Sequence, residues 1–285
     1  MLGLAPALVV LAAITIAPAG YLFLTSLTPL NLTMPGTAWD FSGPHYNYLD
    51  LWEDERFLRS AWFQAQLSVA TVALQLLGGL GAALLLNRDT PIRRFGRSAL
   101  LVPMVLPPIA VGILWRVMYT VDISPFHRFM AWIGLPVPPL TTDPDFALWA
   151  IVLVDSWEWF PFTMLLVLAA LQMIPESPIE AARIDGASDW QMFRYVLFPY
   201  IAPTLVVAGL FRLIDSIKAF PLIYVLTSGG PGDATTVTNY YAFVQAFNFS
   251  LWGYASAIAT LMVVTIFMIS WIIDRLGGNS DGRHD

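Results

Sequence analysis

The chain has 285 residues, of which 57% are hydrophobic and only 12% charged, and its mean hydropathy is +0.66. A soluble domain carries about 25% charged residues, so this composition indicates a protein that has the lipid bilayer as its solvent. The sequence has no cysteine and a net charge of -6 with scattered basic residues, which excludes disulfides and thiolate sites and gives no sign of a nucleic-acid surface.

Six segments are apolar and long enough to cross a bilayer, which takes roughly 20 residues per helix. The predicted spans are 3–27, 62–86, 98–119, 146–172, 200–227 and 252–273. The first segment could be a secretory signal, since "IAPAG" resembles a cleavage site. It lacks a basic start, however, and its apolar run is long for a signal. We therefore expect an all-α, polytopic membrane protein with one transmembrane domain over 1–285.

The arginines determine the predicted orientation in the membrane. The 87–97 connection, "NRDTPIRRFGR", is rich in arginine, and basic residues gather in cytoplasmic loops. Alternation then places the 173–199 loop and both termini in the cytoplasm. The 28–61, 120–145 and 228–251 segments lie outside, and the Gly-Pro-Gly content of "TSGGPGDATT" predicts a turn in the last of them.

Ionisable residues occur inside the predicted spans, where each costs about 2.5 kcal/mol or more near a helix centre. They are Arg116, Asp155, Glu158, Arg212, Asp215 and Lys218. Asp155, Glu158 and Trp159 share one helix face by their spacing. The three in the fifth span are spaced by threes, so that Asp215 is able to neutralise either cation.

Two interpretations of these charges remain open. In the first, some of them line a polar pathway for a hydroxylated solute, because carboxylates and guanidinium groups exchange hydrogen bonds with hydroxyls. Trp157 or Trp159 then offers a flat face for a sugar ring. In the second, they form ion pairs between helices that only hold the bundle together.

The 173–199 loop is polar although two apolar spans flank it. Ser177 and Glu180 have the spacing of a capping box, Gly186 fits a left-handed helix end, and Ser188 with Gln191 forms a second box. The pattern predicts a helix, a tight glycine turn and a second helix that protrude from the membrane. An ordinary pair of amphipathic interfacial helices is the alternative.

The stretch "EAARIDGASDWQMFRYVLFPYIAP" resembles the EAA loop of permease subunits in binding-protein-dependent ABC importers. The similarity runs over roughly 45–275. Within it, "AALLLNRDTPIRRFGRSALLVPMVLPPIAVGILWRVMY" and "FRLIDSIKAFPLIYVLTSGGPGDATT" are similar to carbohydrate-uptake permeases of the maltose type. The "LTSGGPG" stretch at 226–232 resembles the member of the permease pair that carries LTxGGPG after its fifth span.

The resemblance implies a type I ABC importer permease fold in a bacterial inner membrane, with the EAA loop docking as a coupling helix on a cytoplasmic ATPase. The residues implied in coupling are Glu180, Ala181, Ala182, Arg183, Asp185, Gly186 and Ala187. The implied partners are a second permease in a heterodimer, an ABC ATPase dimer, an extracytoplasmic solute-binding protein and membrane lipid. Because Asp215 and Lys218 lie closer to the outer end of the fifth span, a third interpretation makes them an outer gate or a contact with the solute-binding protein.

The chain has no pattern for ATP hydrolysis of its own. A phosphate-binding loop needs a Gly-Lys-Ser/Thr sequence, whereas the one lysine, Lys218, lies between Ile217 and Ala219. ATP and Mg²⁺ are therefore expected on the partner ATPase, with no cofactor, metal or catalytic residue on this chain.

Two other function classes compete with the permease interpretation. An ion-coupled secondary transporter that uses the intramembrane charges as a proton relay predicts an internal repeat. No repeat is visible, and the EAA loop would have no role in such a transporter. A membrane hydrolase is the other class, but His45, His127 and His284 fall in predicted loops or the tail, so no catalytic triad or metal site forms in the spans.

Overall fold

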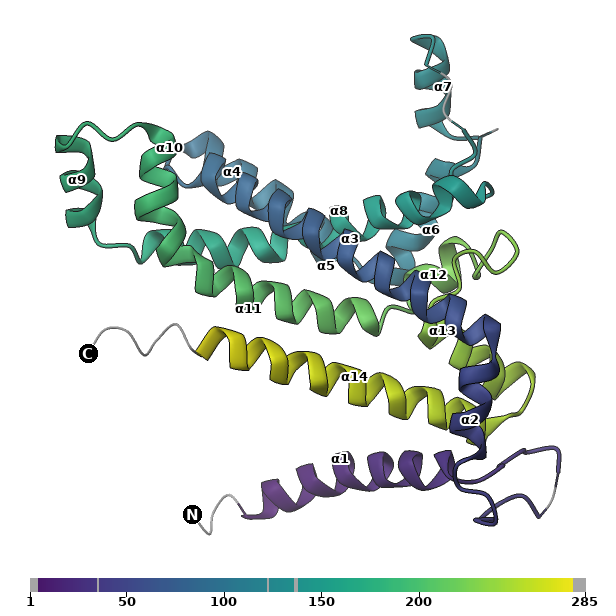
Figure 1. Cartoon of the computed structure of the whole chain (residues 1–285). Helices are drawn as coiled ribbons and strands as arrows, with labels where there is room; N and C mark the ends of the chain where they lie inside the picture. Colours follow the sequence, from purple (N-terminus) through teal and green to yellow (C-terminus); the bar gives the residue numbers. More distant parts are fainter. Residues whose placement is uncertain (1–4, 35, 122, 136–137, 279–285) are drawn as a thin grey trace. The chain divides into compact units, whose positions relative to one another are not determined.

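The computed structural model describes residues 5–34, 36–121, 123–135 and 138–278 (Figure 1). They fall into two compact units, one within 1–64 and 236–269 and the other within 65–235 and 270–285. Each unit is described by itself. Two helices, α3 and α14, begin in the first unit and end in the second.

The first unit surrounds a small hydrophobic core. Its elements are α1 (Ala5–Ser26), α2 (Tyr46–Glu53), the start of α3 (Glu55–Leu86), α13 (Thr238–Phe243), the π-helical turn η3 (Val244–Asn248) and most of α14 (Trp252–Gly278). The core contains Leu51 and Phe57 together with Ala257 and Ile258 of α14. Among the described residues, the extended pairing is limited to one bridge between Asn31 and Leu251.

Asp54 joins three helices of the first unit. Its Oδ1 accepts hydrogen bonds from the backbone N–H groups of Arg56 at 2.9 Å and Phe57 at 3.2 Å, which caps the start of α3. Its Oδ2 accepts from the hydroxyls of Tyr241 at 2.6 Å and Tyr254 at 2.5 Å. Burial by itself raises the pKa of the Asp54 carboxyl, but these hydrogen bonds outweigh it and hold the pKa below its ordinary value.

The second unit contains the remaining helices. They are α4 (Pro91–Leu100), α5 (Val102–Val105), α6 (Pro108–Tyr119), α7 (Pro125–Trp132), α8 (Pro144–Gln172), α9 (Glu176–Ile184), α10 (Asp189–Gln191), the π-helical turn η2 (Met192–Leu197), α11 (Phe198–Ile217) and α12 (Pro221–Leu226). Because α8 runs from residue 144 to 172, the connection that holds α7 and the loop that holds α9 lie at its opposite ends (Figure 1).

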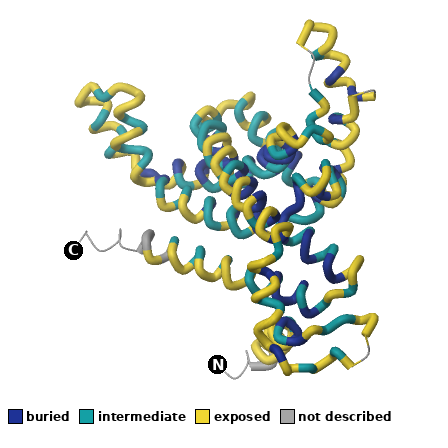
Figure 2. The backbone as a smooth tube through the Cα atoms, turned by 45° about the vertical axis from the view of Figure 1, so that its right-hand side comes forward, coloured by how far each residue is buried: buried dark blue, intermediate teal, exposed yellow. Residues whose placement is uncertain are grey.

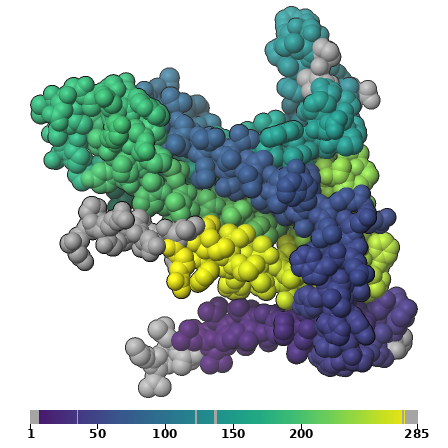
Figure 3. All heavy atoms as spheres, viewed as in Figure 1, coloured from purple at the N-terminus to yellow at the C-terminus, as the bar shows by residue number. Residues whose placement is uncertain are grey.

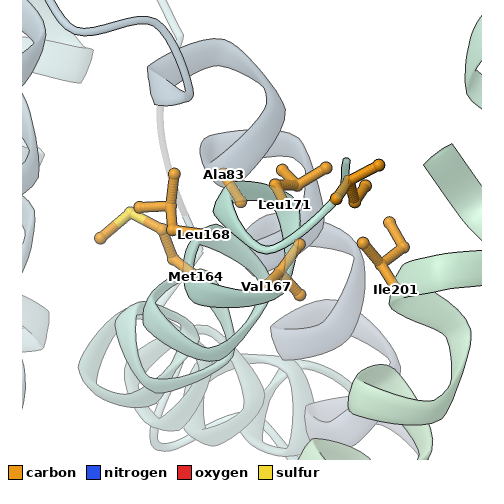
Figure 4. Close-up of a cluster of buried hydrophobic side chains, with 7 residues drawn as sticks. Ala83, Met164, Val167, Leu168, Leu171 and Ile201 are labelled. Atoms are coloured by element: carbon orange, nitrogen blue, oxygen red, sulfur yellow. The ribbon is translucent and has the colours of Figure 1, made fainter. Parts of the chain in front are cut away.

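Helix α8 is the central helix of the second unit. In its most apolar stretch 56% of the residues are buried inside the protein, against 17% for the 189–217 helix. Figure 2 marks the buried residues in dark blue. Figure 4 shows the core that results, in which Val167 and Leu171 of α8 lie between Ala83 of α3 and Ile201 of α11, with Met164 of α8 on the side away from Ile201.

Small residues allow α3 to approach α8 closely. A Cβ on Gly79 would lie 2.5 Å from Cβ of Thr163 and 2.8 Å from the backbone nitrogen of Met164, whereas a Cβ on Gly81 would meet nothing within 4 Å. The "LLGGLG" stretch therefore places one glycine at the point where the two backbones meet.

The third predicted span, 98–119, is not a straight helix. The segments Pro91–Val105 and Pro108–Tyr119 meet at an angle of 97°. Pro103, Pro107 and Pro108 lack the N–H groups that would continue the helical bonding, so the chain turns at Leu106 and Pro107. With this bent pair counted as one span, the described residues contain up to six candidate spans.

The fifth predicted span, 200–227, also breaks. Helix α11 ends at Ile217, and α12 begins anew at Pro221. The predicted turn follows, since Ser228, Gly229 and Gly232 all have positive φ. Thr235 Oγ1 closes this turn by donating to the carbonyl oxygen of Gly230 at 2.6 Å.

Candidate functional site

The loop between α8 and α11 has the predicted helix–glycine–helix form. Helix α9 ends in a Schellman motif: the N–H of Gly186 donates to the carbonyl oxygen of Arg183 at 3.1 Å, and that of Ala187 to Ala182 at 3.0 Å. Gly186 has a φ of +75°, which confirms the left-handed conformation expected of it. The end of α9 is thereby fixed without any side-chain contact.

The first predicted capping box is wrong, and the second is confirmed. Helix α9 begins at Glu176, with Pro175 as the residue before it, so Ser177 lies inside the first turn where its hydroxyl cannot act as a cap. At α10, Ser188 Oγ accepts from the N–H of Gln191 at 3.3 Å, and Gln191 Oε1 accepts from the N–H of Ser188 at 2.8 Å.

The residues predicted to couple lie on the outer surface of this loop. Glu180, Ala181, Arg183, Asp185 and Gly186 are exposed, and Ala182 and Ala187 are half-buried. The opposite face of α9 is anchored, because Ile179 packs against the core cluster of Figure 4. The loop protrudes from the second unit (Figure 3).

Several large hydrophobic side chains of this loop are exposed, which the sequence did not predict, and Ile184 and Trp190 are two of them. Ile184 is 85% exposed and Trp190 is 69% exposed. Because polar and apolar residues are mixed in these short helices, the sequence pattern does not reveal that either side chain is exposed. Solvent-facing apolar groups beside charged ones are typical of a surface that another protein covers.

Four of the predicted intramembrane charges, Asp155, Arg212, Asp215 and Lys218, form one network in the second unit. Gln75 of α3 links them: its Nε2 donates to Asp155 Oδ2 at 2.7 Å, and its Oε1 accepts from Arg212 Nε at 2.8 Å. Arg212 lies 3.8 Å from Asp155 and 3.4 Å from Asp215, and Lys218 lies 3.1 Å from the other oxygen of Asp215. Asp215 thus pairs with both cations, as its spacing predicts.

A cavity of about 290 Å³ opens beside this network. Its polar lining consists of Asp155, Glu158, Trp159, Arg212, Asp215 and Lys218, and its apolar lining includes Pro108, Phe220 and Leu222. Arg212 lies over the Trp159 ring at 4.5 Å. The cavity thus brings together six of the seven residues predicted for a pathway, and it combines apolar and polar walls as small-molecule sites do.

The seventh predicted residue, Trp157, lies elsewhere. Its ring packs edge-on against Trp115 of α6 at 5.5 Å, and it does not line the cavity. Arg116 is likewise separate, since its Nη1 donates to the carbonyl oxygen of Val225 at 3.1 Å. Gln75 was not predicted from the sequence. It is the one polar side chain in the apolar run "VALQLLGG", and only this isolation could have indicated a role for it.

The chain matches the family described as "binding-protein-dependent transport system inner membrane component" over residues 75–278. It is 35% identical to a probable ABC transporter permease protein of Sinorhizobium fredii, over 98% of this chain and 90% of that protein. It is 37% identical to the trehalose/maltose transport system permease protein of Thermococcus litoralis, over 81% and 78% of the two chains. The sulfoquinovosyl glycerol transport system permease protein of Agrobacterium fabrum is 32% identical, over 96% and 88%.

The fold has relatives among solved structures. A chain of a bacterial ABC transporter involved in the import of the acidic polysaccharide alginate superposes with a TM-score of 0.84 at 20% identity, over 97% of this chain and 93% of that one. A chain of the MetNI methionine ABC transporter gives a TM-score of 0.60 at 19% identity, over 78% and 95%. These likenesses establish a type I ABC importer permease fold. The chain therefore belongs to the binding-protein-dependent transport system inner membrane components, as the permease subunit of an ABC transporter.

Proposed function

We propose that this permease subunit imports a carbohydrate and takes its energy from a separate ATPase through the 173–199 loop. The observation that carries the proposal is the similarity, at 30% identity or more and over most of the chain, to permeases named for trehalose, maltose and sulfoquinovosyl glycerol. The polar cavity beside Trp159 supports it, because a sugar needs hydroxyl partners and a flat ring face.

The energy is proposed to enter at α9. Its exposed residues Glu180, Arg183 and Asp185, with the small Ala181 between them, suit a groove on a cytoplasmic ATPase dimer that binds ATP and Mg²⁺. Since Ile179 and the Schellman motif fix α9 to the second unit, force on α9 would move α8 and α11 as well. Movement of these helices would open the cavity to one side of the membrane and then to the other.

The proposed assembly contains further partners. A second permease would supply the other wall of the pathway, and an extracytoplasmic solute-binding protein would deliver the sugar. We place the complex in a bacterial inner membrane with both termini of this chain in the cytoplasm. The secondary-transporter alternative is not favoured, because family membership and the α9 loop both fit a subunit driven by a partner.

Reconstitution tests the proposal. The chain is assembled in liposomes with a partner permease, an ATPase and a solute-binding protein from the same organism, and uptake of radiolabelled trehalose, maltose and sulfoquinovosyl glycerol is measured. We expect uptake that requires internal ATP. Uptake that follows a proton gradient and ignores ATP, or transport of no carbohydrate at all, would contradict the proposal.

A further inference from the structure

The lining of the second unit's cavity includes one carboxyl group, that of Glu158, with an oxygen that has no hydrogen-bond partner among the described residues. Glu158 is 1% exposed, and the oxygen in question is its Oε1. Glu158 nevertheless lines the cavity together with Asp155 and Trp159. A buried polar group without a partner costs free energy, and at membrane depth such a residue commonly has a functional role.

The two cations of the cavity are engaged by other carboxylates. Arg212, whose side chain is 3% exposed, lies 3.8 Å from Asp155 and 3.4 Å from Asp215. Lys218 lies 3.1 Å from Asp215. The positive and negative charges of these four residues balance, so the Glu158 carboxyl adds an acidic group that these pairs do not compensate.

We infer that Glu158 selects the solute. It accepts a hydrogen bond from a hydroxyl or ammonium group on the part of the solute that contacts it, and it excludes a solute with an anionic group at that position. This inference rests on the proposed function, since it assigns the chemistry of the carbohydrate at the same cavity. A carboxyl oxygen accepts hydrogen bonds. When Glu158 is ionised, it also repels a uronate or sulfonate within a few ångströms more strongly in a low-dielectric site than in water.

Three probes that differ at one position test the inference. They are trehalose, its 6-amino-6-deoxy analogue and its 6-carboxylate analogue, and binding to the detergent-solubilised transporter complex is measured by equilibrium dialysis at fixed salt. We expect the wild type to bind the carboxylate analogue about tenfold or more weakly than trehalose, because of like-charge repulsion. The amino analogue should bind at least as tightly as trehalose.

Two variants at Glu158 separate charge from packing. Glu158→Gln keeps a hydrogen-bond acceptor but not the acid; it should bring the affinities for trehalose and the carboxylate analogue to within about threefold of each other, and weaken binding of the amino analogue. Glu158→Asp keeps the acid and should keep the wild-type order. Glu53→Gln is the matched control, because Glu53 is exposed on α2 and does not line this cavity, and it should leave all three affinities as in the wild type.

The outcomes distinguish this inference from the proposed function. Equal wild-type affinity for trehalose and its carboxylate analogue, or a Glu158→Asp variant that loses discrimination as Glu158→Gln does, overturns the inference alone. So does failure of the wild type to bind either trehalose or the amino analogue. A reconstituted complex that transports no carbohydrate overturns the proposed function, whatever the dialysis gives.

Discussion

Arg212 is the residue on which the polar network of the second unit depends. It donates to Gln75, lies within ion-pair distance of two carboxylates and stacks on Trp159. Its side chain is 3% exposed, so most of its contacts are with protein groups. The buried guanidinium group is tolerated because Gln75 of α3, Asp155 of α8 and Asp215 of its own helix all interact with its N–H groups.

Replacement of Arg212 by methionine should therefore destabilise the protein. Removal of one member of a buried ion pair leaves the other uncompensated and costs about 3–5 kcal/mol. The double variant Arg212→Met/Asp155→Asn should recover part of this loss, since the orphaned charge is then absent. Thermal unfolding of the two single variants and the double variant in detergent measures the coupling, and strictly additive losses would argue against the pairing described here.

In the first unit, Asp54 is the residue that joins the helices, and its hydrogen bonds predict that the stability of this unit depends on pH. Its pKa is lowered from 3.8, because the hydrogen bonds from Tyr241, Tyr254 and the backbone outweigh the effect of burial. A carboxyl with a depressed folded-state pKa contributes stability that is complete above its unfolded value and is lost as pH falls through the folded value. The contacts among α2, α13 and α14 should thus loosen below about pH 4.

Hydrogen exchange in residues 46–57 and 238–254 measures this loosening. Protection in the wild type should fall as the pH is lowered through the region below 3.8, after correction for the intrinsic exchange rate. Asp54→Asn should show reduced protection at neutral pH and little further change in acid. Equal acid sensitivity in both proteins would assign the effect to some other carboxylate.

At the scale of elements, the crossing of α3 and α8 depends on a single missing side chain. Gly79→Ala would force a Cβ to 2.5 Å from Thr163 and 2.8 Å from the backbone of Met164, and overpacking of this kind costs about 1–3 kcal/mol. Gly81→Ala is the matched control in the same helix, with nothing within 4 Å of the new atom. It should be neutral or slightly stabilising, because alanine favours helix over glycine.

Melting temperatures of the two alanine variants in the same detergent test this prediction. A lower melting temperature for Gly79→Ala, with no decrease for Gly81→Ala, is the expected result. Equal behaviour of the two would show that α3 and α8 do not meet at Gly79.

The α9 turn is the element on which coupling is proposed to depend. Gly186→Pro removes the N–H that donates to Arg183 and imposes a φ near −65°, opposite in sign to the native +75°. The sugar transported per ATP hydrolysed should then fall sharply in proteoliposomes, while the complex still hydrolyses ATP. Gly186→Asn should retain most of the coupling, because asparagine tolerates the left-handed region.

At the scale of the whole molecule, the absence of cysteine makes the membrane orientation directly measurable. Ser177 and Thr142 are both exposed and lie beyond opposite ends of α8. A cysteine at 177 should react with a membrane-impermeant maleimide in inside-out vesicles and not in right-side-out ones. A cysteine at 142 should show the reverse, and reaction of both on the same side would refute the proposed topology.

Much of the architecture could be read from the sequence because the cause is local. Long apolar runs predict helices that cross a bilayer, and Gly186 predicts the left-handed end of α9. The first capping box was wrong because the helix begins at Glu176, which places Ser177 inside its first turn.

The assembly of the cavity could not be read in this way. Spacing placed Asp155 with Glu158 and Arg212 with Asp215 on their own helices, but it could not reveal that Gln75 joins them or that Trp157 turns to Trp115 instead. The sequence by itself determined the membrane helices, the coupling loop and the candidate charges, because hydrophobicity and backbone preference act over a few residues. Only the tertiary structure decided which charges are paired and that Glu158 is left over, because ion pairs depend on distances between helices that the chain brings together from far apart.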